Sequence, residues 1–387
     1  MRVTHLLLEN FRNIERLELS LPQGRTVLVG ENAQGKTNIL EAVYCLAIAK
    51  SVRAGHEREL IRWDVLSEPL PHTRVTGSLE RQRGNVTIEI VMQLNPPGSD
   101  GEDGQRQLLK RVKVNNIPKR LSDVVGEVQA VLFEPQDIEL VYGTPSVRRH
   151  HLDLTLSQVD RQMLRELQRF NRTLSQRNPL LKSIRDGEAD VDELAYWDGE
   201  LTESGAYIIE ARGKALGELD TLSAKVHNEL TGARERLRLL YRPSVERAGE
   251  QAITEMYRTM LTRLQAREIA AGTTLAGPHR DDFAFEVNDV SLAAYGSRGQ
   301  QRLATLSLKL AEARFMTARI GEQPLLLLDD VLSELDAPRR GYLMRAIGEY
   351  GQSLLTTADA QALDSAYLAQ SNVLRVESGR VSLITAA

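Results

Sequence analysis

Several features are scarce in this chain of 387 residues, and each scarcity excludes a class of protein. The single cysteine, Cys45, excludes an internal disulfide framework and a cysteine-based metal cage, and it is typical of a reducing compartment. No uninterrupted apolar run reaches the roughly 18 residues of a membrane-spanning helix, and the N-terminal residues do not form a signal peptide. We therefore expect a cytoplasmic protein with no membrane partner.

An excess of either charge is also lacking. The chain has 49 Lys and Arg against 53 Asp and Glu, for a net charge of -4. A chain this balanced is not an electrostatic nucleic-acid binder as a whole, so any DNA contact requires a local basic surface. The seven histidines show no zinc-type spacing, which predicts no transition-metal site.

Both ends of the chain read as strands. Alternating patterns predict strands at Val3–Leu8, Ile14–Leu21, Arg25–Gly30, 73–94 and 107–114. The Pro- and Gly-rich stretch at 95–101 predicts a solvated hairpin tip. Towards the C-terminus we expect strands at Thr273–Leu275, Phe283–Val287 and Pro324–Asp330, with helices at 297–320 and 337–349 and further strand runs after Ser353.

From about Pro145 the pattern is helical for more than a hundred residues, with Pro179 and Pro243 as the main interruptions. Strand-rich ends around a helical middle favour one α/β domain interrupted by a helical insertion. The expected division is 1–150 for the N-terminal part of this α/β domain, 151–270 for the insertion, and 271–387 for the C-terminal part.

A phosphate-binding loop follows the third expected strand. Its pattern is G-x-x-x-x-G-K-[ST], in which two glycines let backbone N–H groups face phosphate oxygens. Lys36 is expected to reach the β- and γ-phosphates and Thr37 to ligate Mg²⁺. An amphipathic helix follows, whose N-terminal dipole favours an anion. The loop reads Gly30-Glu31-Asn32-Ala33-Gln34-Gly35-Lys36-Thr37.

A hydrophobic strand at 324–328 ends in two carboxylates, Asp329 and Asp330. Beside a phosphate-binding loop, the first acid is expected to hold the Mg²⁺ shell and the second to polarise a water that attacks the γ-phosphate. Asp330 is one methylene shorter than the glutamate usual at this position, which favours slow hydrolysis. On their own, two such acids also fit the start of a solvated loop.

A third segment opens the helix that precedes this strand. Its serine at a helix N-terminus can present a hydroxyl and free N–H groups to an anion, although the same pattern fits an ordinary helix start. The segment is Ser297-Arg298-Gly299-Gln300.

Together these motifs resemble the ATP-binding-cassette ATPases, and within them the RecF recombination-mediator family over essentially the whole chain. The distinguishing segments are Leu8–Asn13, Gly30–Asn38, Gly143–Pro145 with Arg148 and Arg149, Gln176–Asn178, Gly277–Asp282, Ser297–Leu306 and Leu328–Asp336. The resemblance implies an ABC-type ATPase head of mixed α/β sheets with an inserted α-helical domain.

The resemblance also implies roles for individual residues. Two chains would sandwich two ATP molecules, so that Ser297, Arg298, Gly299 and Gln300 serve the nucleotide on the partner's loop. Ser333 and Asp336 would belong to a loop at the dimer interface. Arg12 and Asn38 would lie at the nucleotide, with Gln136 as a second catalytic residue near Mg²⁺ and the attacking water.

The function implied is that of a weak DNA-dependent ATPase in recombinational repair and replication restart. An ATP-driven homodimer would bind double-stranded DNA and single-strand/double-strand junctions, with RecR and RecO as partners and RecA loading as the result. A transporter ATPase subunit is disfavoured by the insertion and by the lack of a switch histidine near Ser353–Thr357. A chromosome-organising SMC-like ATPase is disfavoured because no long heptad arm is present.

Two further groups have open interpretations. His279, Arg280, Asp281 and Asp282 fit a hydrogen-bonded structural corner better than a metal or catalytic cluster. A series of arginines in the helical region fits either a solvated face or a DNA contact. These arginines are at positions 148, 149, 161, 165, 169, 172 and 177.

Overall fold

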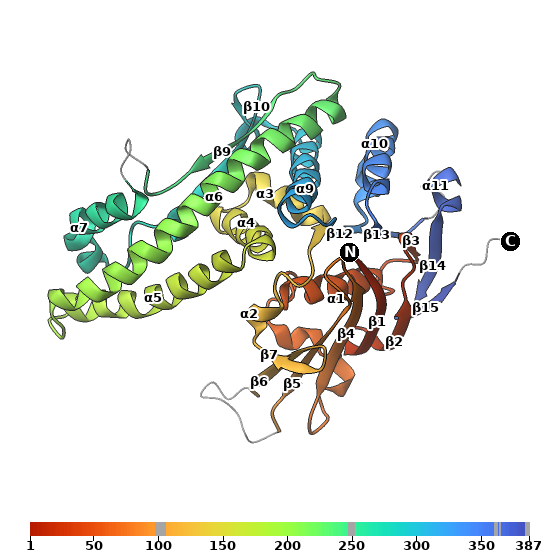
Figure 1. Ribbon diagram of the computed structural model, residues 1–387, viewed down its shortest axis with the longest axis horizontal. Helices are drawn as coiled ribbons and strands as arrows, with labels where there is room; N and C mark the ends of the chain where they lie inside the picture. The colour runs from red at the N-terminus through yellow and green to blue at the C-terminus, as the bar shows by residue number, and fades with distance from the viewer. Residues whose placement is uncertain (97–105, 247–251, 360–362, 364, 384–387) are drawn as a thin grey trace. The chain divides into compact units, whose positions relative to one another are not determined.

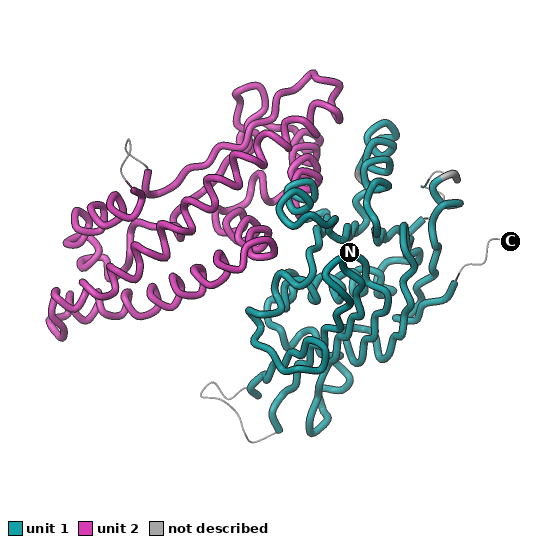
Figure 2. Tube along the Cα trace, in the orientation of Figure 1, with its two compact units in different colours: residues 1–136, 312–387 teal, residues 137–311 magenta. Residues whose placement is uncertain are grey.

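The structure, a computed structural model, describes residues 1–96, 106–246, 252–359, 363 and 365–383. The chain folds as two compact units, one made of residues 1–136 and 312–387 and the other of residues 137–311 (Figure 2). We call them the head unit and the inserted unit. The head unit is mixed α/β and the inserted unit is mainly helical, as the sequence predicts.

The first sheet of the head unit is antiparallel, in the order β2-β1-β4-β5-β6-β7 (Figure 1). Its alternation of buried and half-buried residues along β4 and β5 is the period-2 pattern on which the prediction rested. Residues 97–101 of the expected hairpin tip lie outside the described residues. The strands are β1 (Arg2–Phe11), β2 (Ile14–Ser20), β4 (His72–Glu80), β5 (Val86–Leu94), β6 (Leu108–Val114) and β7 (Ile117–Lys119).

The second sheet of the head unit is mostly parallel, in the order β15-β14-β3-β13-β12-β8. Strand β12, which lies between β13 and β8, is buried along its whole length, as expected for a parallel strand covered on both faces. The strands are β3 (Gly24–Val29), β8 (Ala130–Phe133), β12 (Leu325–Asp329), β13 (Gln352–Thr357), β14 (Ser371–Glu377) and β15 (Arg380–Leu383).

Helix α1 (Lys36–Ile48) contacts strands of both sheets, namely β1, β4 and β5 of the first and β8, β12 and β13 of the second. Eleven of its side chains are buried, because neighbours cover it on several sides. The position of its first turn is therefore fixed by packing. The other head-unit helices are α2 (Leu121–Val124), α10 (Ala337–Gly348) and α11 (Ser365–Ala369).

The inserted unit is built on α6, a helix of 38 residues that packs along α5 (Figure 1). A small sheet of order β11-β10-β9 completes it. The helices are α3 (Glu139–Tyr142), α4 (Pro145–Val159), α5 (Arg161–Arg185), α6 (Leu194–Thr231), α7 (Ile253–Ala271) and α8 (Leu292–Tyr295), and the strands are β9 (Leu237–Arg242), β10 (Asp282–Val287) and β11 (Val290–Ser291).

The compact units divide the chain at positions other than the expected 150 and 270. Strand β10 pairs with β9, which draws residues after 270 into the inserted unit, and helix α4 packs on α5. The second boundary falls inside α9 (Arg298–Ile320), between residues 311 and 312.

Three local predictions are wrong. The expected strand at Thr273–Leu275 is a loop, in which Thr274 is buried and hydrogen-bonded to Asn178 on α5. Pro179 does not interrupt the helix but lies inside α5. The predicted continuous helical stretch contains strand β9, whose partner β10 lies about 40 residues further along the chain.

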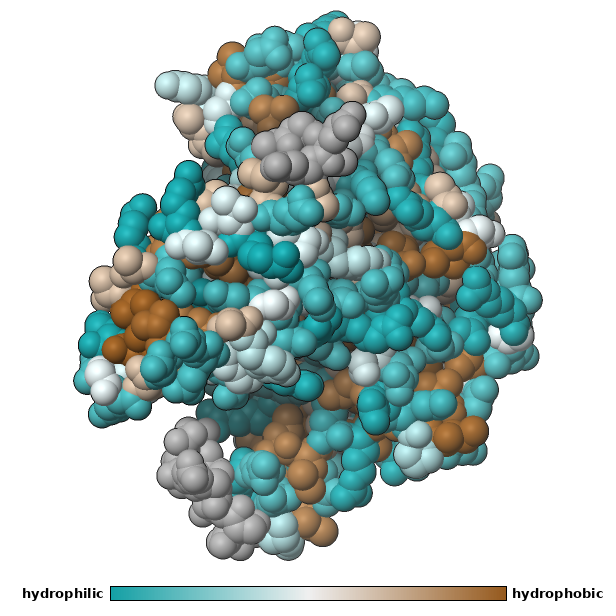
Figure 3. Space-filling view, turned by 60° about the vertical axis from the view of Figure 1, so that its left-hand side comes forward, coloured by the Kyte–Doolittle hydropathy of each residue, from teal (hydrophilic) through white to brown (hydrophobic). Residues whose placement is uncertain are grey.

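The molecular face in Figure 3 is mainly hydrophilic, with hydrophobic residues in small separate groups. Among the described residues, the most exposed large apolar side chains are Tyr295, Trp63, Leu383, Tyr196 and Ile117. No helix in the described ranges is long and apolar enough to cross a membrane.

Candidate functional site

The loop between β3 and α1 wraps tightly at its two glycines. Gly35 has a φ of 105°, and a Cβ there would lie 2.8 Å from the Asn13 side chain. A Cβ on Gly30 would overlap the carbonyl oxygen of Val376 in β14. Both positions therefore require glycine, for the turn at Gly35 and for close approach at Gly30.

The loop, the end of β12 and the end of β13 surround one cavity of about 250 Å³. It brings together the two predicted motifs of the head unit, which are almost 300 residues apart in the chain. The lining residues are Asn32, Ala33, Gln34, Gly35, Lys36, Thr37, Asn38, Pro135, Asp329, Asp330 and Thr356.

Lys36 is the cation of this cavity. Its Nζ donates to the carbonyl oxygens of Gly30, at 2.5 Å, and Glu31, at 2.7 Å. Burial lowers the pKa of Lys36, while the nearby carboxylates of Asp330 and Asp329 act in the opposite direction. The ammonium is thus held by loop carbonyls, and an incoming phosphate oxygen can replace these acceptors.

Asp329 is the hydrogen-bonding centre of the site. Its Oδ1 accepts from Thr37 Oγ1 at 2.8 Å and from Thr356 Oγ1 at 2.7 Å, and its Oδ2 accepts from Arg53 at 2.5 Å. Thr37 and Asp329 are the two predicted Mg²⁺ ligands, and the structure brings them into direct contact. Hydroxyl and carboxylate oxygens are ligands that Mg²⁺ prefers, together with water and substrate phosphates.

Arg53 and Glu134 are residues of this site that sequence reasoning missed. Arg53 forms ion pairs with Glu134 and with Asp329. A signal for Glu134 existed, because it directly follows the hydrophobic strand β8, and Asp329 is the last residue of β12. The two strands are parallel, with Phe133 opposite Leu328, so their acids meet at the same carboxyl edge. Arg53 lies in an irregular segment after α1 and carried no signal.

Asp330 adopts the left-handed conformation, with φ 49°, at the turn after β12. Its N–H donates to Thr356 Oγ1 at 3.0 Å, and its carbonyl accepts from Ser333 Oγ at 2.8 Å. Burial, and then the neighbouring Asp329 carboxylate, raise the pKa of Asp330. The carboxylate is consequently a stronger proton acceptor than a solvated aspartate.

Thr356 lies in the segment Ser353–Thr357, where a transporter ATPase would have a switch histidine and this chain has none. Because it contacts both Asp329 and Asp330, it ties β13 to the acidic pair.

The predicted Arg12 is not one of the residues that line the cavity. Its guanidinium is paired through two hydrogen bonds with the buried Glu41 of α1. The neighbouring Asn13 contacts the loop instead, since its side chain donates to Ala33 O at 3.4 Å and accepts from Asn38 at 2.8 Å. Asn38 also lines the cavity.

Three other predicted residues lie on exposed segments near the acidic strands. Gln136 is exposed on a 3₁₀ turn (Pro135–Ile138) directly after the cavity-lining Pro135. Ser333 and Asp336 are exposed between β12 and α10, where Asp336 caps α10 by accepting from Arg339 N at 3.1 Å.

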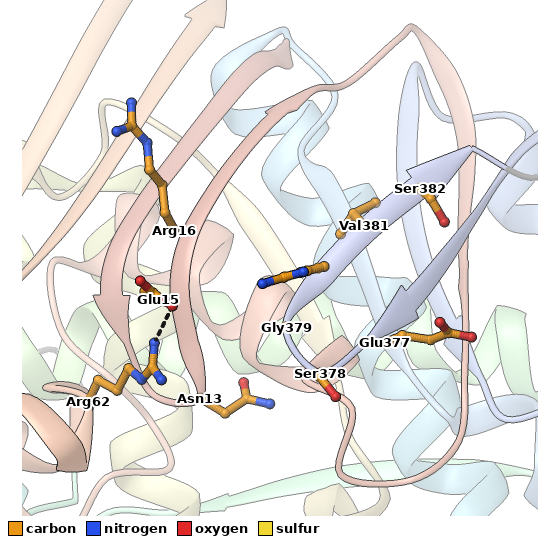
Figure 4. Close-up of a pocket in the computed structure, with 10 residues that line it drawn as sticks. Asn13, Glu15, Arg16, Arg62, Glu377, Ser378, Gly379, Val381 and Ser382 are labelled. Atoms are coloured by element: carbon orange, nitrogen blue, oxygen red, sulfur yellow. Dashed lines mark ion pairs between the residues drawn. The ribbon is translucent and has the colours of Figure 1, made fainter.

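A second, larger groove of about 840 Å³ is lined in part by Asn13 (Figure 4). The β1–β2 end contributes Asn13, Glu15 and Arg16 to one side of the groove, and the β14–β15 turn contributes Ser378 and Gly379 to the other. That turn also braces the phosphate-binding loop, because the N–H groups of Ser378 and Gly379 donate to Gln34 at 2.6 and 2.9 Å.

The predicted signature segment belongs to the inserted unit. Ser297, Arg298 and Gly299 are exposed at the start of α9. Ser297 and Gln300 are joined by two hydrogen bonds, and Arg298 lies over the Tyr142 ring at 5.0 Å from its centroid. The expected meeting of this segment with a second chain's loop stays a prediction.

Most of the arginines in the series at 148–177 form hydrogen bonds or ion pairs within the inserted unit. Arg177 is wholly buried and binds Asp198, Glu268 and Thr274. Arg148 binds Asp282, Arg149 donates to the carbonyl of Asp281, and Arg169 binds Glu200 and Glu203. Arg165 and Arg172 are exposed.

The 279–282 segment is a corner held by hydrogen bonds to a buried carboxylate. Asp281 is buried and accepts from Arg212, Tyr241 and the Ser244 N–H. Burial lowers the pKa of His279 to about 4. These contacts favour the structural interpretation of the segment. No group of three metal-ligating side chains occurs in the described part of the chain.

Comparison with known proteins bears on the whole chain. A family model described as "RecF/RecN/SMC N terminal domain" matches residues 2–382. A DNA replication and repair protein RecF from Roseiflexus castenholzii is 43% identical, over 98% of this chain and 99% of its own length. The RecF of Bacillus mycoides is 38% identical, with 98% of each chain covered.

Solved structures give the same result. A structure of the recombination mediator protein RecF with ATP, from the RecFOR pathway, matches with a TM-score of 0.85 and 31% identity, over 99% of this chain and 97% of that chain. An Smc head bound to the C-terminal winged-helix domain of ScpA matches with a TM-score of 0.54 at 14% identity, over 100% of this chain and 98% of that chain. The second likeness concerns the fold alone, and together they confirm the predicted ABC-type ATPase head.

Proposed function

The chain belongs to the RecF family, and from this premise we propose that it is an ATP-switched DNA-binding protein of recombinational repair and replication restart. ATP closes two copies head to tail, the closed dimer holds DNA at single-strand gaps, and slow hydrolysis releases it. RecR and RecO are the proposed partners and RecA loading is the result. The expected cytoplasmic location stays a prediction.

The observation that carries the nucleotide part is the contact between Thr37 Oγ1 and Asp329 Oδ1, at 2.8 Å, beside the ammonium of Lys36. Two oxygen ligands for Mg²⁺ and one cation for phosphate thus line a single cavity. When bound there, Mg²⁺ supplies charge neutralisation for the triphosphate. The ATP complex of a similar protein supports ATP as the nucleotide.

Each residue then has a defined task. Lys36 exchanges the carbonyls of Gly30 and Glu31 for the β- and γ-phosphate oxygens. Asp330 orients the attacking water and accepts its proton, which its raised pKa favours. The exposure of Ser297, Arg298 and Gly299 at the start of a helix supports their role as donors to the partner's γ-phosphate.

The test is sedimentation of the wild type and of Lys36→Ala, with and without ATP, Mg²⁺ and gapped duplex DNA. The wild type is expected to be monomeric alone, dimeric with ATP, and bound to DNA as the dimer, with an affinity that falls as salt rises. Lys36→Ala is expected to stay monomeric because the phosphates lose their cation.

An ATP response in Lys36→Ala would refute the assignment of the loop. An ATP-dependent dimer without DNA affinity at low salt would instead favour the transporter-type ATPase.

A further inference from the structure

The signature segment is held in shape by a hydrogen-bonded pair. The backbone N–H of Gln300 donates to Ser297 Oγ at 3.2 Å, and the backbone N–H of Ser297 donates to Gln300 Oε1 at 3.1 Å. This reciprocal arrangement is a capping box at the start of α9. Ser297 Oγ accepts a hydrogen bond here, so its hydroxyl proton can still be donated to a further acceptor.

The other end of the Gln300 amide is fixed by Glu235, which lies between α6 and β9. Gln300 Nε2 donates to Glu235 Oε1 at 2.9 Å. A carboxylate only accepts hydrogen bonds, so the amide must present its NH₂ group to Glu235. Its oxygen then necessarily faces Ser297. Glu235 therefore determines which way round the Gln300 amide lies.

Glu235 is itself anchored by a buried residue. Its Oε2 lies 3.1 Å from Nε2 of His227, which is 0% exposed on α6. The other ring nitrogen of His227 lies 3.1 Å from Ser307 Oγ on α9. The adjacent Arg236 is paired through its backbone with Asn288. The segment that carries Glu235 is thus held on both sides.

We infer that Glu235 is a positioning residue for the signature segment. It orients Gln300 so that Ser297, at the N-terminus of α9, presents its hydroxyl to the partner's γ-phosphate. This inference rests on the function proposed above. Because the phosphate-binding loop belongs to the head unit, a change at Glu235 is expected to alter ATP-driven dimerisation and not ATP binding by the monomer.

Three variants test this inference through the monomer–dimer Kd with ATP. Glu235→Gln keeps an oxygen for Gln300 and is expected to dimerise within about threefold of the wild type. Glu235→Lys offers Gln300 only hydrogen-bond donors, so the Gln300 amide is expected to turn over. Its NH₂ group then faces the Ser297 N–H, and two donors cannot bond to each other. Dimerisation should therefore weaken about tenfold or more. Gln300→Glu sets two carboxylates side by side and should weaken dimerisation similarly.

The double variant Glu235→Lys with Gln300→Glu is decisive. Its new carboxylate at position 300 can accept both from the ammonium introduced at position 235 and from the Ser297 N–H. It is expected to dimerise at least several-fold more tightly than Gln300→Glu alone, which holds as a comparison even if Glu235→Lys does not fold. Glu188→Lys, an exposed position in the inserted unit, is the control for the charge change.

The results distinguish a failure of the proposed function from a failure of the role inferred for Glu235. A wild type that does not dimerise with ATP would refute the proposed function. A wild type that dimerises, with Glu235→Lys behaving like Glu188→Lys or with no recovery in the double variant, would overturn only the role of Glu235. Equal ATP affinity of all monomers is expected, and a loss in Glu235→Lys monomers would also contradict that role.

Discussion

The two units of the molecule use charged side chains in opposite ways. In the head unit, Lys36 borders a cavity and donates to two carbonyl oxygens that a ligand oxygen can replace. In the inserted unit, Arg177 and Arg212 are 0% and 3% exposed, and protein carboxylates, a hydroxyl and a carbonyl surround their guanidinium groups. The comparison shows that surroundings, rather than residue type, distinguish a binding cation from a structural one.

The same comparison changes the interpretation of the basic series in the helical region. Residue spacing alone left a solvated face and a DNA contact open. Arg148, Arg169 and Arg177 turn out to be paired with carboxylates within the unit. A buried charge is tolerated only when it is paired, so the buried Arg148 and Arg177 are committed to the fold.

The largest expected effect is that of Arg177→Ala. It leaves Glu268, which is 0% exposed, without its buried partner, and the inserted unit should lose about 3–5 kcal/mol of stability. Arg172→Ala, at an exposed position of the same helix, is the control and should change stability by less than about 0.5 kcal/mol. Urea unfolding followed by circular dichroism measures both. Equal midpoints would show that burial does not separate these arginines.

A smaller effect is expected in the head unit from Asp330→Asn. The amide cannot accept a proton from water, so the ATPase rate should fall about 100-fold while ATP binding is retained. The ATP-bound dimer should then persist longer on DNA. Single-turnover hydrolysis and filter binding measure the two quantities, and a wild-type rate would shift the catalytic role to Glu334 or Gln136.

The stability of the inserted unit should depend on pH through His279, in the corner formed by residues 279–282. The pKa of His279 is about 4 in the folded chain against an ordinary value of 6.5. As pH falls from about 6.5 toward 4, the unfolded state takes up this proton first, so stability is lost across that range. The loss from this residue alone is about 2 kcal/mol at pH 5.

His279→Gln keeps a donor for the Thr274 carbonyl and should remove this part of the acid sensitivity, with little change at pH 8. Unfolding curves at pH 8 and pH 5 give the difference. Parallel losses in wild type and variant would mean that other groups cause the acid sensitivity.

How much the sequence predicted depends on how local the interactions are. Strand β3, the glycine loop, α1 and β12 followed from short patterns, because each is specified by its own residues. Strand β9 was missed because its pairing with β10 is distant in sequence. Pro179 was misjudged because α5 packs along α6, and this packing outweighs the hydrogen bond that a proline loses.

Prediction of the functional site from the sequence was limited in the same way. Spacing was enough to place Lys36, Thr37 and Asp329 together, since the phosphate-binding pattern is contiguous and Asp329 ends a buried strand. Arg53 could not be found, because its contacts with Glu134 and Asp329 depend on an irregular segment and on the register of two parallel strands.

The central claim is that the loop of one chain and the signature segment of another form each ATP site. Mixing Lys36→Ala with Ser297→Arg chains, each inactive alone, tests it by the ATPase rate. A mixed dimer contains one site with both defects and one with neither, so hydrolysis should reappear, at no more than about one active site per dimer, while Ser297→Arg monomers bind ATP normally. A mixture as inactive as its components, together with weak ATP binding by Ser297→Arg monomers, would contradict the claim and place Ser297 in its own chain's nucleotide site.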